Sequence, residues 1–236
     1  MKNLPNFTQP SAKYGVGDIE IGPDNRLWIG TYRNNYSDYN GLGGGTILFS
    51  DNGTSFTTAY ETTVSERSGR VELAVSSSNA LAVYGLIEND EKIKQIVRTS
   101  DGGATWSVLA LPDDDDNGID ADDFTRGQAW YDLIAEVDPN RDSTVVIGGI
   151  NLHMSTDGGS TWKQISKWSN NANMGSMPYS YVHADQHVIR YKPGSSSEII
   201  FGNDGGVFWT NDFSNPSATD LIVARNNGYN VTQFYA

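Results

Sequence analysis

The chain has 236 residues, a net charge of −13 and no cysteine. The acidic balance argues against a nucleic-acid partner, because phosphate binding needs clustered Lys and Arg and the sequence contains no basic stripe. The lack of cysteine excludes disulfides, thiol catalysis and cysteine-ligated metal centres. No apolar segment approaches the roughly 20 residues of a membrane span. Residues 1–11 lack the apolar core of a secretory signal, so we expect a protein that stays in the cell or a mature or trimmed piece.

Short strands and turns dominate the expected secondary structure. Glycine is abundant, at 25 residues, aromatic residues make up 11% of the chain, and the apolar runs are short. This composition is typical of an all-β protein. In chain order, strands are expected at residues 18–21, 27–30, 70–75, 81–84, 130–137, 144–147, 152–155, 162–166, 183–191, 198–201, 207–210 and 231–235.

A motif of the form Ser/Thr-x-Asp-Gly-Gly-x-Thr-Trp recurs along the chain. Its aspartates stand at positions 51, 101, 157 and 212, at steps of 50, 56 and 55 residues. Such a period, with about four strands per unit, predicts a β-propeller of four-stranded antiparallel blades. The whole chain is expected to form one propeller region of four to five blades. The predicted parts are blades at 14–62, 68–112, 127–170 and 181–228, an acidic inter-blade loop at 113–123, and the start of a further blade at 229–236.

The motif residues have a mechanical reason to recur at a turn. An aspartate in a hairpin accepts hydrogen bonds from backbone amides two residues further on. Glycines supply positive φ angles without a steric clash, and the Trp or Phe fills the gap between neighbouring blades. We therefore expect a structural and not a catalytic role for these residues: Asp51, Asp101, Gly103, Trp106, Asp157, Gly159 and Trp162.

These windows resemble the Asp-box, or BNR, repeat of sialidases, sortilin-type receptors and xyloglucanase-type glycoside hydrolases. The second half of the chain resembles one group more closely, the large secreted propeller proteins of Bacteroidota that are exported by the type IX secretion route. That resemblance rests on residues 123–133, 148–162, 183–187, 201–206 and 226–234. It implies an extracellular or outer-surface location. Members of that group usually carry more blades and a sorting domain, so an incomplete propeller is expected, with further blades or domains as partners.

Three polar residues alternate in the strand expected at residues 183–191. His183, Asp185 and His187 would then point to one face, where they could hold a metal ion or act as acid and base. The alternative is structural: one histidine packs, the other forms a hydrogen bond, and Asp185 caps a loop.

The acidic loop begins like a calcium-binding loop. Oxygen ligands alternate at Asp113, Asp115, Asn117 and Asp120, with a turn glycine among them. Position twelve is Phe124 and not Glu, which departs from the EF-hand pattern. The alternative is a solvated acidic loop without metal, and no other cofactor is indicated.

Asp204 lies in a glycine-rich turn, residues 202–206. By resemblance to the xyloglucanase-type enzymes, it is a candidate for one of two carboxylates that face each other across a cleft. Asp132 and Asp18 are candidates for the second, by their place in the blades. The same glycine-rich pattern also forms ordinary turns. Sialidase activity is not expected, because the Arg-Ile-Pro motif of that family is missing.

Two segments combine aromatic rings with amide side chains, a mixture on which sugar rings and peptides stack and hydrogen-bond. Residues 32–39 contribute Tyr32, Tyr36 and Tyr39. Residues 167–181 contribute Trp168, Tyr179 and Tyr181. In the alternative, each segment folds over its own blade.

The sequence therefore favours a secreted or cell-surface β-propeller that binds a glycan or another protein, since no catalytic set is complete. The alternative is a glycoside hydrolase with paired carboxylates. A third hypothesis is a purely structural part of a larger secreted protein.

Overall fold

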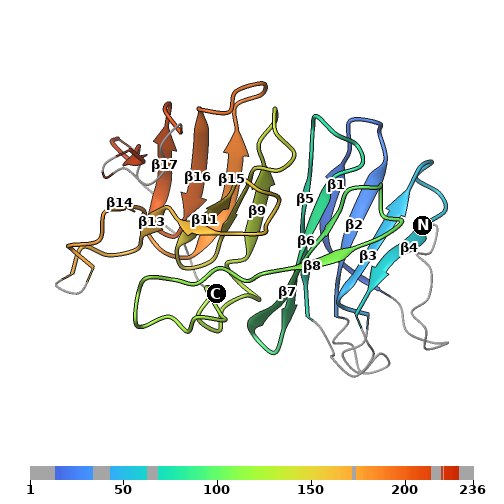
Figure 1. Cartoon of the computed structure of the whole chain (residues 1–236), viewed down its shortest axis with the longest axis horizontal. Coiled ribbons are helices and arrows are strands. Elements are labelled where there is room, and N and C mark those ends of the chain that lie inside the picture. The colour runs from blue at the N-terminus through green and yellow to red at the C-terminus, as the bar shows by residue number, and fades with distance from the viewer. Residues whose placement is uncertain are drawn as a thin grey trace.

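The computed structural model describes residues 14–33, 43–62, 69–171, 174–213, 219 and 221–228. Within these residues the chain is all-β and contains no helix. The strands form four four-stranded antiparallel sheets, which follow one another along the chain, and one short parallel pair (Figure 1). In every four-stranded sheet the strands lie side by side in sequence order, as in the blades of a propeller. The predicted fold class is confirmed.

The first sheet contains β1 (Gly15–Ile21), β2 (Leu27–Tyr32), β3 (Thr46–Ser50) and β4 (Thr57–Glu61). The second contains β5 (Val71–Val75), β6 (Val83–Asn89), β7 (Lys92–Thr99) and β8 (Ser107–Leu109). The third contains β9 (Ile134–Val137), β10 (Val145–Gly148), β11 (Leu152–Ser155) and β12 (Lys163–Gln164). The parallel pair is β13 (Ser166–Lys167) and β14 (Ser180–Tyr181). The fourth sheet contains β15 (Gln186–Tyr191), β16 (Ile199–Asn203), β17 (Gly206–Thr210) and β18 (Val223–Ala224).

The first strands of the four sheets converge. β1 contacts β5, β5 contacts β9, and β9 contacts β15. These strands lie near the middle of the molecule in Figure 1, while β4 and β17 lie further out. The sheets are therefore arranged around a common region lined by β1, β5, β9 and β15, which we call the inner strands.

Apolar side chains fill the space between consecutive sheets. Trp28 and Ile47 of the first sheet pack against Leu73 of the second, and all three are almost completely buried. A second cluster joins the second and third sheets, and a third joins the third and fourth. Burial of one such large apolar side chain contributes about 1.5–3 kcal/mol. Packing between sheets therefore stabilises the fold.

Two inner strands begin later than the sequence predicts. The strand expected from Trp130 begins at Ile134, because the preceding residues form a turn in which Gln128 O accepts hydrogen bonds from the backbone amides of Tyr131 and Asp132. The strand expected from His183 begins at Gln186. Tyr36, Tyr39 and the predicted further blade at 229–236 lie outside the described residues.

The repeated turn is held by a short network of hydrogen bonds. In the second sheet the Thr99 hydroxyl donates to Asp101 Oδ1 (2.7 Å) and accepts from the backbone N–H of Gly103 (2.9 Å). The backbone N–H of Thr105 donates to Asp101 Oδ1 (2.9 Å). This donor lies four residues beyond the aspartate, so the expectation of bonds from two residues further on is wrong. Gly103 has φ +91°, which favours glycine.

The turn of the third sheet repeats this network. The Ser155 hydroxyl donates to Asp157 (2.8 Å), and the backbone N–H of Thr161 donates to the same carboxylate (2.9 Å). The Trp that ends each motif lies between sheets. Trp106 contacts Trp28 edge-on at 6.3 Å, and Trp162 Nε1 donates to the carbonyl of Ala110 (2.8 Å).

The first turn is built differently, and Asp51 does not accept the hydrogen bonds of the turn that were expected of it. Ser50 occupies the place of Thr99, since it pairs with Leu27 as Thr99 pairs with Val83. The turn is one residue shorter, so the side chain that caps it is Asn52. Asn52 Oδ1 accepts from the backbone N–H groups of Thr54 (2.8 Å) and Ser55 (2.9 Å). Asp51 instead forms an ion pair with Arg26 at 2.7 Å.

Replacing the two neighbouring residues separately tests this assignment. Asn52→Ala should lower the free energy of unfolding by about 1 kcal/mol, because two amides of the turn lose their acceptor. Asp51→Ala should cost less than about 0.5 kcal/mol, since the Asp51 carboxylate is largely solvent-exposed. Urea unfolding of both variants measures the difference. A larger loss for Asp51→Ala would restore Asp51 as the capping residue.

Candidate functional site

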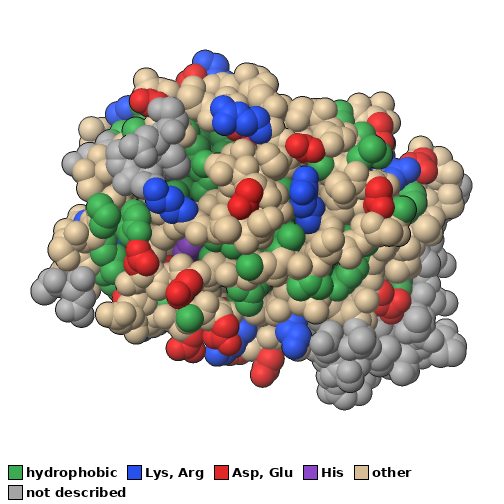
Figure 2. All heavy atoms as spheres, viewed as in Figure 1, with side chains coloured by type: hydrophobic (Ala, Val, Ile, Leu, Met, Phe, Trp, Pro, Cys, Tyr) green, Lys and Arg blue, Asp and Glu red, His purple; other side chains and the backbone are tan. Residues whose placement is uncertain are grey.

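A pocket of about 550 Å³ opens between the acidic loop and the segment that follows β13. The sequence predicts calcium ligands in the acidic loop and aromatic ligand-binding residues in the segment that follows β13. Acidic side chains gather at the lower edge of the face shown in Figure 2, over the segment between β8 and β9. The residues that line the pocket are Asp116, Asn117, Gly118, Arg126, Trp168, Asn171, Met174 and Met177.

Two aspartates of the acidic loop point inward. Asp114 and Asp116 are buried, while Asp113, Asp115 and Asn117 are exposed. Asp114 accepts a hydrogen bond from Asn151 Nδ2 (2.9 Å), and burial raises its pKa to about 6. N–H donors therefore hold the inward carboxylates of this loop in place.

Asp116 joins the loop to the pocket. Its carboxylate accepts hydrogen bonds from Trp168 Nε1 (2.9 Å) and from the backbone N–H of Gly118 (3.0 Å). The indole of Trp168 is thereby fixed in the pocket wall, with part of its surface exposed to solvent.

Two of the four predicted calcium ligands, Asp115 and Asp120, have other partners in the structure. The carboxylate of Asp115 accepts a hydrogen bond from the hydroxyl of Tyr179, and Asp120 lies 3.4 Å from Lys92 Nζ. In the described part of the chain, no group of three or more His, Asp or Glu side chains is arranged to hold a metal ion. The calcium site stays a prediction from the sequence.

Arg126 adds a positive charge to the pocket. It has φ +54°, a conformation that a residue with a side chain rarely adopts. The turn is fixed by Asp123, which is buried and accepts hydrogen bonds from Thr125 Oγ1 (2.5 Å) and from the backbone N–H of Gly127 (2.7 Å). The buried carboxylate thus holds the guanidinium-bearing residue at the pocket wall.

Tyr32, Tyr179 and Tyr181, the other predicted aromatic ligands among the described residues, do not line this pocket. Tyr32 lies at the end of β2 in the first sheet. Tyr179 binds Asp115 through its hydroxyl, and Tyr181 in β14 contacts the ring of Phe208 edge-on at 6.1 Å.

A second group of predicted residues meets near the start of β15. His187 Nε2 lies 2.7 Å from Asp204 Oδ1, and the hydroxyl of Tyr131 donates to the same oxygen at 3.0 Å. The Tyr131 ring stands edge-on to the His187 ring at 4.7 Å. About a third of the Asp204 side chain is exposed, so this carboxylate is accessible and held by two neighbours.

His183, Asp185 and His187 do not share one face of a strand, contrary to the expectation. Asp185 has φ +62°, which interrupts the extended backbone before β15 begins. His183 Nδ1 contacts the carbonyl of Ala184 at 3.0 Å, and Asp185 accepts a long hydrogen bond from Gln128 Nε2 (3.5 Å). Each side chain thus has its own local contact.

Asp132, the second predicted catalytic carboxylate, is fully buried. Neither of its oxygens has a hydrogen-bond partner within the described residues. Burial, reinforced by the charge of Asp185, raises its pKa to about 8. Arg70 fixes the neighbouring backbone, because its guanidinium donates to the carbonyl of Leu133 at 2.9 Å.

Charged side chains of the inner strands meet at the centre of the molecule. Arg190 of β15 lies 2.5 Å from Glu136 of β9 and 3.7 Å from Glu20 of β1. Burial raises the pKa of Glu136, and also that of Glu72 in β5, to about 7 despite an arginine beside each. Neither this cluster nor the contact of Tyr131 with Asp204 was predicted from the sequence. A local sequence motif cannot indicate either contact, because the residues that meet belong to different sheets.

No protein-family model matches the chain, and no curated protein matches it. The solved structure of an ancestral GH74 enzyme superposes with a TM-score of 0.58 at 15% identity, over 97% of this chain and 27% of that chain. The Myceliophteria thermophila Cps50 (Swd1) β-propeller domain superposes with a TM-score of 0.52 at 8% identity, over 86% of this chain and 53% of that chain. This chain thus spans only about a quarter of the length of the first relative. At these identities the likeness shows the fold, and the fold of this chain is that of a β-propeller.

Proposed function

We propose that the protein is a β-propeller binding module whose ligand is a glycan, held in the pocket around Trp168. The observation that carries this proposal is the lining of the pocket, where an indole face lies among amide, carboxylate and guanidinium groups. A sugar ring presents an apolar C–H face and a rim of hydroxyl groups. An aromatic plane with fixed polar neighbours complements both.

The geometry supports binding of a ligand without large rearrangement. The indole of Trp168 is held by Asp116, and the backbone at Arg126 is held by the Asp123 turn, so the aromatic plane is oriented before a ligand arrives. Pre-organised side chains lower the entropic cost of association. We further propose, from the resemblance to secreted propeller proteins, that the module acts outside the cell as part of a larger type IX secreted protein.

Binding to a panel of polysaccharides, measured by isothermal titration calorimetry, tests this proposal. Trp168→Ala should weaken binding by at least about tenfold, which corresponds to about 1.4 kcal/mol. Trp130→Ala is the control, because the indole of Trp130 is 50% exposed and lies outside the pocket. Thermal unfolding of both variants shows that the fold is retained. Equal affinities of the two variants, or no binding by the unchanged protein, would contradict the proposal.

A glycoside hydrolase is the second candidate function, and Asp204 is the observation that favours it. This carboxylate is accessible, and it is positioned by His187 and Tyr131. Asp132 would be the protonated partner, since its raised pKa keeps the acid form near neutral pH. We place this function second because Asp132 is fully buried, so a substrate oxygen could not reach it without movement of its turn.

Release of reducing ends from the same polysaccharides separates the two functions. If the protein is a hydrolase, Asp204→Asn should reduce the rate by at least about a hundredfold with little change in melting temperature. Asp122→Asn removes an exposed carboxylate elsewhere and serves as the control. Activity that survives Asp204→Asn would eliminate Asp204 as a catalytic residue.

The protonation of Asp132 has a consequence for stability that needs no substrate. An exposed aspartate has a pKa of about 3.9. Between that value and about 8, the folded protein holds a proton that the unfolded chain has lost. The contribution of Asp132 to the free energy of unfolding is therefore fully present below pH 4. It decreases as the pH rises from 4 to 8 and does not change further above pH 8.

Asp132→Asn should make the decline in melting temperature between pH 5 and 8 shallower, because the amide stays neutral throughout. Glu72 and Glu136 titrate in the same range and remain in the variant, so part of the decline should persist. Thermal scans of the variant, of the unchanged protein and of Asp122→Asn measure the slopes. An unchanged slope for Asp132→Asn would mean that Asp132 is ionised in the folded protein at neutral pH.

A further inference from the structure

Arg126 is an exposed arginine at the wall of the Trp168 pocket. Within the described residues, its guanidinium group takes part in no hydrogen bond or ion pair. Arg26, Arg70 and Arg190 differ, because each forms an ion pair with a carboxylate. A guanidinium carries five N–H donors in a planar fork that fits a carboxylate. The pocket therefore presents a set of donors that the chain itself leaves unused.

The backbone at Arg126 favours a different residue. Its φ of +54° is one that glycine adopts without strain, and Gly127 follows with φ +77°. An arginine at this place raises the energy of the turn, and residues in such conformations are concentrated at functional sites. The turn does not require an arginine, so the guanidinium group is the better reason for its presence.

The carboxylates next to this pocket already have donors from their own segments. Asp116 Oδ2 accepts from Trp168 Nε1 (2.9 Å), and Asp116 Oδ1 accepts from the backbone N–H of Gly118 (3.0 Å). The two oxygens of Asp123 likewise accept from Thr125 and from Gly127. A cationic ligand would have to compete with these donors, whereas an anionic ligand would meet the unused donors of the guanidinium group.

A second positive charge lies behind the wall of the same pocket. Lys167 of β13 is only 6% exposed, and its Nζ donates to the carbonyls of Gly175 (3.2 Å) and Met177 (3.1 Å). In the described part of the chain, no carboxylate forms an ion pair with this ammonium group. Met177 is one of the residues that line the pocket. A buried charge without a counter-ion costs free energy, and an anion bound in the pocket would reduce that cost.

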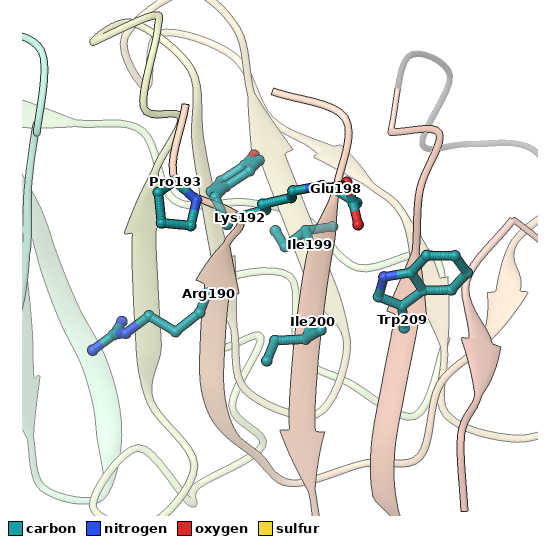
Figure 3. A pocket seen from close by; sticks show the side chains of 8 residues that line it. Arg190, Lys192, Pro193, Glu198, Ile199, Ile200 and Trp209 are labelled. Carbon is teal, nitrogen blue, oxygen red and sulfur yellow. Dashed lines mark hydrogen bonds and ion pairs between the residues drawn. The ribbon is translucent and has the colours of Figure 1, made fainter. Parts of the chain in front are cut away.

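A pocket of about 280 Å³ beside the fourth sheet shows the contrast (Figure 3). The cationic side chains that line it are both paired, since Lys192 Nζ lies 2.6 Å from Glu198 and Arg190 lies 2.5 Å from Glu136. In Figure 3 the side chains of Lys192 and Glu198 point toward each other. The chain thus neutralises the cations of that pocket itself, and among the described residues it does not do so at the Trp168 pocket.

We propose that the glycan bound in the Trp168 pocket is an acidic one, in which Arg126 holds the carboxylate of a uronic acid while the sugar ring lies on the indole of Trp168. This inference rests on the proposed function, because it specifies the ligand class of the same site. The net charge of −13 opposes the approach of an anion at long range. At about 0.15 M salt, however, charges more than about 8 Å away are largely screened, so the groups at the pocket wall decide the preference.

Calorimetric titration with fragments of polygalacturonate, alginate and hyaluronan, each compared with its methyl-esterified form, tests the proposal. Esterification removes the charge and leaves the sugar ring unchanged. At least one polyuronate should bind about tenfold or more tightly than its ester. Arg126→Gln should weaken binding of the acid form by at least about tenfold and leave binding of the ester unchanged. Arg141→Gln is the matched control, because Arg141 is exposed and lies outside the pocket.

Arg126→Gly separates the role of the guanidinium group from that of the turn. Glycine adopts the φ of this position without strain, so the melting temperature should not fall. The preference for the acid form should nevertheless be lost, as in Arg126→Gln. If Arg126→Gly kept the full preference for the acid form, the proposal would be overturned.

The failure of this inference can be told apart from the failure of the proposed function. Binding that Trp168→Ala weakens, but that is equally tight for acid and ester, would overturn the acidic preference and leave a glycan-binding pocket. Binding of neutral polysaccharides alone would have the same meaning. No binding of any polysaccharide would overturn both. Poly-L-glutamate provides the last comparison, because binding of this peptide as tightly as the polyuronates would show recognition of charge without sugar and would overturn the proposal.

Discussion

The second sheet of this protein has two apolar faces, and each of them is buried against a neighbouring sheet. In the second sheet, Leu73 packs toward the first sheet and Leu86 toward the third, and both are almost completely buried. Neither face could be left in water without a loss of about 1.5–3 kcal/mol for each large side chain. The sheets therefore stack in sequence order, and what remains variable is the set of loops around them.

The regular part of this arrangement could be predicted from the sequence because it repeats. The spacing of the motif gives the number of sheets, and the alternation of apolar residues predicts strands in every sheet, but it sets no bounds for β3, β4, β7 or β8. The prediction failed where a local hydrogen bond decides the outcome. Asp51 matches the motif by position, yet the shorter turn gives the capping role to Asn52. A turn held by Gln128 likewise delays β9.

The candidate sites could be predicted only in part, because they are assembled from segments distant in sequence. Trp168 and Asn117 were predicted separately, one as an aromatic ligand and the other as a calcium ligand, and the structure places both in one pocket wall. The burial of Asp114 and Asp116, and not of Asp113 and Asp115, depends on donors such as Asn151 and Trp168. The sequence of the loop shows that alternate aspartates point in opposite directions, but it could not indicate which of the two pairs faces inward.

The packing of the sheets also determines which charged side chains meet at the centre of the molecule. The inner strands bring carboxylates of several sheets together, and burial raises the pKa of Glu72 and of Glu136 to about 7. Burial also raises the pKa of Asp132, which precedes β9, to about 8. Arg190 reduces the repulsion by contacting Glu136 and Glu20, which belong to two other sheets. The centre thus carries charges whose energy depends on pH, while the Trp168 pocket lies among loops whose residues can change without disturbing the sheets. Ligand recognition is better accommodated by those loops than by the centre, because a substitution at the centre alters the contact between sheets as well.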